Sequence, residues 1–388
     1  MLNIDHILLI IFGIILLLII YINRHRVKVE KFLFPLLYIV MYRTRLGLDA
    51  MDKYAKKHPR FFNIFALFSI IIGFIGMVFI FESILVSAYK ILLNPTISEQ
   101  GARLLLPGFQ FPGLPRLSFF HWIIAIFVLA VVHEFSHGVI ARLYNVKVKS
   151  SGFAVLGIVL PIFPAAFVEP DEVQLSQKSR KAQLGVLAAG SFSNLILSGI
   201  LFLVFFFIFT PITASLVEFD GIIITNLEDN NPAKNSGLKI GEKVIEVNDN
   251  KIEELDDFSK EIKNLKPGDE LKIKTNESSY NLVATTHPKI EDKGYLGLSY
   301  GINNIGYAIK TYLWFNLLIY WLFVINLLVG LINLFPMFIT DGAKMLHVGL
   351  SKFIRNDTIL KKLWGMINLF CVLLLLINFL PPIIGWLS

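Results

Sequence analysis

Val131-Val132-His133-Glu134-Phe135-Ser136-His137-Gly138 lies within a long apolar run and contains two histidines four residues apart. On a helix, residues with this spacing share one face, so His133 and His137 could both offer an imidazole nitrogen to one ion. Glu134, next to the first histidine, could take a proton from a water molecule at that ion. This is the H-E-x-x-H pattern, which is typical of zinc hydrolases and supplies two metal ligands and a general base.

The apolar run that contains this motif extends from Phe119 to Tyr144 and is long enough to span a bilayer. Ionisable side chains are unfavourable deep within a span, so the presence of three in this one favours a functional site over a chance match. A catalytic zinc ion usually has three protein ligands and one open coordination position. The motif therefore predicts one Zn²⁺ per chain and a third ligand elsewhere in the sequence.

The composition is that of a membrane protein. Of the 388 residues, 55% are hydrophobic, and the mean hydropathy of +0.65 is too high for a soluble domain. We expect a polytopic α-helical membrane protein with about six transmembrane helices. The expected spans are residues 2–22, 63–93, 119–144, 184–213, 307–334 and 364–386. Cys371 is the only cysteine, which excludes an intramolecular disulfide and a cysteine metal cluster.

Basic residues cluster in the loops that follow the first span and precede the last one. Residues 23–62 contain ten lysines and arginines but only three acidic residues. Because basic loops of membrane proteins remain in the cytoplasm, we expect this loop and the 345–362 loop inside, with both chain ends outside. The net charge of +7 therefore reflects topology and contact with the lipid bilayer, and we expect no nucleic-acid partner.

Two apolar segments differ from ordinary spans. Residues 151–168 are interrupted by glycines and prolines and contain several β-branched residues. We therefore expect a re-entrant β-hairpin that is buried against protein rather than a helix in lipid. Residues 32–41 form a short apolar piece, which we expect to lie at the membrane interface or to re-enter the membrane.

Residues 219–288 differ sharply in composition from the segments on either side. Fourteen acidic residues and nine lysines give residues 219–287 a net charge of −5. Short alternating runs at 221–225, 243–247 and 271–275 are separated by turn signals that contain asparagine, proline or glycine. This pattern predicts a small soluble α/β domain, with several short strands and one or two helices, inserted between the fourth and fifth spans. Its acidic character favours the outer side of the membrane.

Asp341 is the best candidate for the third metal ligand. It follows the fifth span directly, and the expected direction of that span brings it to the same depth as the histidine pair. Pro336 ends the helix, and Gly342 allows a turn that could point the carboxylate into the bundle. The alternative is that Asp341 only caps the next helix, which we expect at 342–350. His347 is a weaker candidate ligand, since it lies further along that helix.

Asn194 places a polar amide within the fourth span. One interpretation is a hydrogen bond between helices, which is common in membrane bundles. The other is a functional role, in which the amide binds the substrate backbone or polarises a carbonyl. The residue types alone leave both interpretations open.

The histidine motif, together with Asn333, Pro336 and Asp341-Gly342 near a later span, resembles the intramembrane metalloproteases of the site-2 protease family. Segments 190–194 and 166–171 also resemble that family, whereas Thr340 stands where its members usually have leucine. The resemblance covers most of residues 119–212 and 305–345. It implies that His133, His137 and Asp341 bind zinc, that Glu134 is the general base, and that the active site lies toward the cytoplasmic side of a prokaryotic cell membrane.

Residues 236–250, Ser-Gly-Leu-Lys-Ile-Gly-Glu-Lys-Val-Ile-Glu-Val-Asn-Asp-Asn, resemble part of a PDZ domain, a module that binds peptides at a sheet edge. Glu242 replaces the commoner aspartate and Asp249 the commoner glycine. The expected organisation has four parts: an N-terminal membrane region with two spans, a basic cytoplasmic loop and an outer connector (1–118), a catalytic membrane core (119–213), the PDZ-like domain (219–288), and the second part of the core with Asp341 and the last span (305–388).

These observations predict a zinc metalloendopeptidase that cleaves membrane-anchored proteins or peptides within or near their transmembrane segments. A helix hides its carbonyl groups in hydrogen bonds, so the substrate must first unwind, and the 151–168 hairpin could offer an edge strand to the extended segment. Two alternatives remain. The chain could be a catalytically silent membrane scaffold with a peptide-binding PDZ-like domain, or a metal-ion transporter, since ionisable residues in spans also mark ion pathways.

Overall fold

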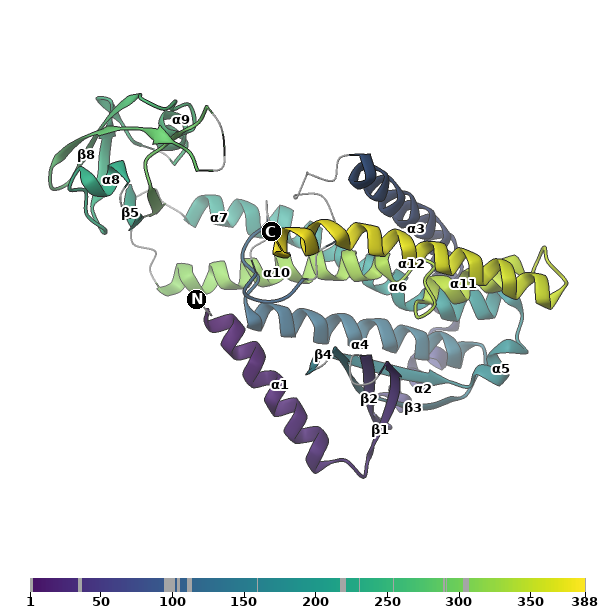
Figure 1. Ribbon diagram of the computed structural model, residues 1–388. Helices are drawn as coiled ribbons and strands as arrows, with labels where there is room; N and C mark the ends of the chain where they lie inside the picture. Colours follow the sequence, from purple (N-terminus) through teal and green to yellow (C-terminus); the bar gives the residue numbers. More distant parts are fainter. Residues whose placement is uncertain are drawn as a thin grey trace. The chain divides into compact units, whose positions relative to one another are not determined.

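Figure 1 shows the computed structural model, which describes residues 3–33, 37–93, 102, 105–109, 114–158, 160–216, 221–229, 231–253, 255–288, 290, 292–302 and 307–387. Outside this description lie residues 95–101, 103–104 and 110–113 of the outer connector expected at 95–118, and residues 219–220, 230 and 254 of the expected insert. The chain forms two compact units. The first combines residues 1–205 and 316–388, and the second contains residues 206–315.

Six helical segments of the described chain are long and apolar enough to cross a membrane, which indicates a polytopic membrane protein. Five of them are the single helices α1 (Ile4–Ile22), α3 (Pro59–Leu93), α4 (Phe119–Leu143), α10 (Tyr307–Ile332) and α12 (Asp357–Leu387). The remaining segment is α6 (Arg180–Val204), which continues through a π-helical turn (Phe205–Phe209) into α7 (Thr210–Leu216). The expected number of long apolar helices is confirmed, and several of them begin a turn or more before the apolar run.

The first unit is built around α6, which packs against α3, α4 and the short helix α11 (Asp341–Leu350). In Figure 1, α4, α6 and α12 run in roughly the same direction, whereas the C-terminal end of α1 leans away from α4. The first turn of α1 is fixed by the buried carboxylate of Asp5, which accepts a hydrogen bond from the backbone N–H of Phe119 at 3.0 Å and pairs with Arg116 at 2.6 Å. Beyond that turn, Gly13 is the only buried residue of α1, so most of this helix packs loosely.

An antiparallel sheet lies beside this helical core, with strand order β1-β2-β3-β4. Its strands are β1 (Val27–Leu33), β2 (Leu37–Thr44), β3 (Val148–Ile158) and β4 (Leu160–Pro170). The hairpin expected at 151–168 is therefore present, and β4 forms one edge of the sheet. The apolar piece at 32–41 contributes to the hairpin β1–β2, which pairs with β3 through contacts such as Val40 opposite Val155. The helices α2 (Leu48–Lys57) and α5 (Glu172–Ser176) follow β2 and β4 respectively.

The second unit contains a sheet of short antiparallel strands with two helices. The strands β5 (Ile222–Leu227), β6 (Lys243–Val247), β8 (Glu270–Thr275), β9 (Ser279–Val283) and β12 (Leu298–Ile302) form the order β12-β5-β6-β8-β9, and β7 (Asn250–Lys251) pairs with β6. Between β5 and β12 lie the helices α8 (Pro232–Asn235) and α9 (Leu255–Lys263) and the strand pair β10 (Thr285–Thr286) and β11 (Gly294–Tyr295), and the unit also includes α7 and the start of α10. The strands expected at 221–225, 243–247 and 271–275 correspond to β5, β6 and β8.

The core of this unit is apolar and closed, with Ile222, Val247, Phe258 and Ile273 fully buried. The turn between β6 and β7 places Asn248 and Asp249 at positive φ angles of 49° and 61°. Asparagine and aspartate tolerate this conformation better than other non-glycine residues do, so the turn forms without the commoner glycine. Because β12 pairs with β5, the sheet includes residues beyond 288.

Candidate metal centre

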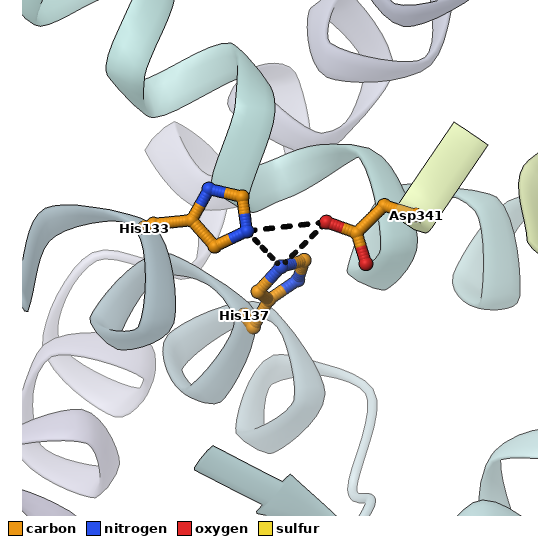
Figure 2. A group of neighbouring side chains, drawn as sticks. All are labelled: His133, His137 and Asp341. Carbon is orange, nitrogen blue, oxygen red and sulfur yellow. Dashed lines mark hydrogen bonds and ion pairs between the residues drawn. The ribbon is translucent and has the colours of Figure 1, made fainter. Parts of the chain in front are cut away.

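Three potential ligand atoms converge where α4, α6 and α11 meet (Figure 2). His133 and His137 share one face of α4, and their Nε2 atoms lie 3.1 Å apart. The same two atoms lie 3.2 Å and 3.1 Å from Oδ2 of Asp341. His133 and His137 are buried, with 7% and 8% of their surfaces exposed. This group meets the geometric requirement for holding one metal ion.

All three candidate ligand positions depend on two glycines that permit close packing. A Cβ atom at Gly190 of α6 would lie 2.6 Å from His133 Nε2, and it would also collide with His137 Nε2. Any larger residue at this position would therefore occupy the space of the ligand nitrogens. Gly342 plays a comparable part beside Asp341, because a Cβ atom there would collide with the backbone of Leu334. Its N–H donates to the carbonyl of Asn333 at 2.8 Å, which joins the start of α11 to the end of α10.

Asp341 is the first residue of α11, but it does not cap the helix. The N-cap is Thr340, whose Oγ1 accepts a hydrogen bond from the N–H of Ala343 at 3.3 Å. The carboxylate of Asp341 is instead directed at the two imidazoles (Figure 2). Burial would raise the pKa of Asp341, but attraction to His137 and the hydrogen bonds with both imidazoles outweigh burial and hold the pKa well below its usual value.

The second ring nitrogen of each histidine contacts α6. His137 Nδ1 lies 2.6 Å from the carbonyl oxygen of Val186, and His133 Nδ1 lies 3.1 Å from Nδ2 of Asn194. Asn194 is fully buried, and its Oδ1 has no hydrogen-bond partner among the residues that the structure describes. Asn194 is also absent from the lining of the cavity at the site. Its observed contact is with a candidate ligand.

A cavity of about 990 Å³ opens onto the three residues, and we call it the metal cavity. Its lining includes Glu134 and residues 164–168 of β4. Glu134 Oε2 accepts a hydrogen bond from the N–H of Val168 at 2.8 Å, so this carboxylate stands between the histidine pair and the sheet edge. His347 also lines the cavity, although it is not part of the group that could hold a metal.

The donor set fits zinc. Two imidazole nitrogens and one carboxylate oxygen are ligands that zinc accepts, and three protein ligands leave one position open at a catalytic site. Tetrahedral bonds of about 2.0–2.1 Å would place neighbouring ligand atoms roughly 3.3 Å apart. The observed separations of 3.1–3.2 Å between the ligand atoms are close to this spacing.

Sequence patterns did not identify three contributors to this arrangement: the Val186 carbonyl, the space at Gly190 and the Val168 N–H. Two are backbone groups, which nearly every residue has, so the residue types do not reveal them. The third is the absence of a side chain. The available signals were indirect: segments 166–171 and 190–194, which resemble the site-2 protease family, contain Val168 and Gly190, and Ala188, Ala189 and Gly190 are consecutive small residues in α6.

Residues 121–378 match the sequence model of peptidase family M50. An "uncharacterized protein" of Methanocaldococcus jannaschii is 30% identical over 305 residues, which cover 77% of this chain and 74% of that protein. A protein of Rickettsia conorii named "putative zinc metalloprotease" is 30% identical over 176 residues, or 38% of this chain and 47% of that protein. A protein of Clostridium acetobutylicum with the same description is 27% identical over 207 residues, or 46% and 58% of the two chains. The chain thus matches about half the length of these two proteins.

Proposed function

The chain belongs to peptidase family M50, a family of zinc metalloproteases, and we propose that it is an intramembrane protease that hydrolyses peptide bonds within or near the transmembrane segments of membrane-anchored substrates. The observation that carries this proposal is the convergence of His133, His137 and Asp341 beside Glu134, on helices of a polytopic membrane protein.

We assign zinc binding to His133 Nε2, His137 Nε2 and the Asp341 carboxylate. When bound there, zinc would act as a Lewis acid that polarises a carbonyl group and lowers the pKa of water. Glu134 lines the same cavity, where its carboxylate can accept a proton from the attacking water and then deliver that proton to the leaving amine. The Val168 N–H holds this carboxylate in place at 2.8 Å.

The free edge of β4 offers a way to hold an extended substrate. In the regular part of the pairing with β3, Val168 directs its N–H away from β3 and toward Glu134. Side chains and hydrogen-bonding groups alternate along an antiparallel strand, so Ala166 also presents its N–H and carbonyl to the free edge. A substrate segment that pairs with this edge would have its carbonyl groups exposed beside Glu134, which a helix would not allow.

We further propose that the second unit is a PDZ-like domain on the outer side of the membrane, and that the metal centre lies toward the cytoplasmic side. The basic loop at 23–62 and the net charge of −5 in residues 219–287 support this orientation. The strand and helix pattern around residues 236–250 supports the relation to PDZ domains. The two alternatives, a silent scaffold and a metal-ion transporter, are supported only by the PDZ-like segment and by the ionisable residues in spans.

The test of the proposed function is Glu134→Gln in the purified, zinc-loaded protein, with a synthetic Leu/Ala-rich transmembrane peptide of about 20 residues as substrate. Because the three ligands are unchanged, the variant should keep one zinc ion per chain, yet its turnover should fall by about 100-fold or more. Glu172→Gln is the matched control, since Glu172 lines the same cavity but its side chain is 84% exposed. Wild-type turnover by Glu134→Gln would refute the assigned role.

A further inference from the structure

A second cavity, of about 460 Å³, adjoins the metal cavity, and we call it the apolar cavity. It lies between α1, α4 and the strands β3 and β4, and every residue that lines it is apolar. It shares Ile126, Ala130 and residues 164–166 with the lining of the metal cavity. The two cavities therefore meet along one side of α4 and the edge strand β4.

The junction between the two cavities is formed mainly by small side chains. Three of its residues are Ala130, Ala165 and Ala166. Ala130 precedes His133 by three residues on α4, so the junction lies about one helical turn from the metal centre. Small side chains at such a boundary leave room for a chain to continue from one cavity into the other.

At its other side, the apolar cavity opens to the surface of the helical core. Phe127, Val131 and Phe153 line it and are 57%, 42% and 45% exposed. Phe127 and Val131 lie on α4, a candidate membrane span, where exposed apolar side chains can face hydrocarbon. A third cavity, of about 300 Å³, shares Leu16, Phe153 and Val155 with the apolar cavity. Space therefore continues from the sheet and α1, through the apolar cavity, to the metal cavity.

The loose packing of α1 explains why this space remains unfilled. Beyond its first turn, α1 buries only Gly13. It contributes Phe12 and Leu16 to the wall of the apolar cavity, and its C-terminal half leans away from α4 (Figure 1). Phe12 packs against a buried cluster that includes Trp122, whereas Leu16 belongs to none of the buried clusters of the described residues.

We propose that the apolar cavity binds the part of the substrate's transmembrane segment that adjoins the scissile bond, while the scissile residues lie extended in the metal cavity. This inference rests on the proposed function. Continuity with the metal cavity favours a polypeptide over a lipid acyl chain, because a lipid would have no need of a path toward the metal centre. The all-apolar lining predicts that large apolar residues are preferred on this side of the scissile bond and that charged ones are excluded.

The first test fills the apolar cavity without altering the metal cavity. Val155 lines the apolar cavity but not the metal cavity, and Val155→Trp places an indole ring in a space that can contain it. We expect kcat/KM for the Leu/Ala-rich transmembrane peptide to fall about tenfold or more. A short peptide with only the residues around the cleavage site should be hydrolysed at the wild-type rate, and zinc content should not change.

Val78→Trp is the matched control, because Val78 of α3 is 66% exposed and lines none of the three cavities. This variant should hydrolyse both peptides like the wild type. Equal hydrolysis of the transmembrane peptide by Val155→Trp and the wild type would overturn the inference. An equal loss on both peptides would overturn it as well, because the short peptide lacks the segment that we place in the apolar cavity.

A second test does not depend on turnover. In the Glu134→Gln background, Leu16→Cys provides a thiol at the apolar cavity, while the native Cys371 is buried and serves as the background control. With an added mild thiol oxidant, transmembrane peptides with one cysteine at successive positions should form disulfides with this thiol only from positions on one side of the cleavage site. Cross-linking without any cleavage by the parent enzyme would contradict the proposed function but support this site. Cleavage by the parent enzyme without cross-linking at Leu16→Cys would refute the site alone.

Discussion

At the residue scale, α6 contacts the second ring nitrogen of both imidazoles in the candidate metal site. A histidine that binds a metal through Nε2 carries its proton on Nδ1, and that proton needs an acceptor. The Val186 carbonyl accepts it from His137 at 2.6 Å. Asn194 lies 3.1 Å from Nδ1 of His133 and has an unpartnered Oδ1. Rotation of this amide by half a turn would supply the acceptor for His133, so we infer that Asn194 is a positioning residue for this ligand.

This role predicts how variants of Asn194 affect zinc binding. Asn194→Leu keeps the approximate size of the side chain but removes the acceptor, so zinc affinity should fall about 10- to 100-fold. Asn194→Asp retains an acceptor for the Nδ1 proton and should bind zinc more tightly than the leucine variant. Competition with a chelator of known affinity measures both. If Asn194→Leu binds zinc like the wild type and loses only kcat, Asn194 instead acts on the substrate, which was the other interpretation of the sequence.

The third ligand gives a separate prediction. Asp341→Ala removes the only carboxylate in the group that could hold a metal, so zinc content should fall well below one ion per chain after dialysis. Asp357→Ala is the control, because Asp357 is an exposed residue in the first turn of α12. Elemental analysis of the purified proteins measures the zinc content. Full zinc occupancy in Asp341→Ala would mean that another side chain, such as His347, completes the site.

At the scale of secondary-structure elements, the edge strand β4 connects the sheet to the candidate site, because its residues 164–168 line the metal cavity and the Val168 N–H donates to Glu134. Ala166 and Val168 direct their backbone groups to the free edge, whereas Ala165 and Phe167 direct theirs to β3. Pro164 belongs to the same outward-directed set as Ala166, so its missing N–H does not weaken the pairing with β3. The strand can therefore remain in the sheet while its outer edge remains available to a substrate.

This geometry predicts a position-specific effect of proline. Ala166→Pro should remove one outward N–H and keep the pairing with β3, so kcat/KM should fall about tenfold or more while zinc content is unchanged. Ala166→Ser keeps the N–H and is the matched control. Both are measured on the Leu/Ala-rich transmembrane peptide. Normal hydrolysis by Ala166→Pro would show that substrates do not pair with this edge.

The sequence predicted some helices and strands more accurately than others. The six long helices follow from their apolar runs, but α6 begins at Arg180 rather than at residue 184, because a helix can extend beyond the apolar segment. The hairpin β1–β2 carries an alternating pattern in Val27-Lys28-Val29-Glu30, which is a strand signal. The prediction for this region considered only the apolar piece at 32–41 and therefore did not include β1. The positions of His133 and His137 follow from helical spacing alone. Pro336 and Gly342 indicated a turn at Asp341, but the close contact between Gly342 and the Leu334 backbone is a long-range packing feature that the local pattern does not contain.

At the scale of the whole molecule, the charge distribution predicts the orientation in the membrane. Lys239→Cys, in the second unit, has an exposed position and should react with a membrane-impermeant thiol reagent in intact cells. Lys56→Cys, in the basic loop, should react only after the cells are opened. The parent protein provides the background, since Cys371 is buried. The reverse pattern would invert the proposed topology.

The second unit is inserted between the segments that carry Asn194 and Asp341, yet the metal cavity is lined by residues of the first unit. We therefore propose that the second unit selects substrates and takes no part in the chemistry. A folded domain on the outer side would hinder substrates that still carry large outer domains. Because β12 pairs with β5, a clean excision must extend to residue 302 rather than stop at 288.

Replacing residues 219–302 with a flexible Gly/Ser linker of about ten residues should leave one zinc ion per chain and permit cleavage of a trimmed substrate. The same variant should gain activity on a substrate that keeps a folded outer domain, because the steric barrier is gone. A chain that keeps the second unit and carries the same linker inserted between residues 304 and 305 reports the effect of the linker alone. If excision abolishes cleavage of the trimmed substrate while zinc remains bound, the second unit must position the substrate or hold the helices together, and its role as a filter is refuted.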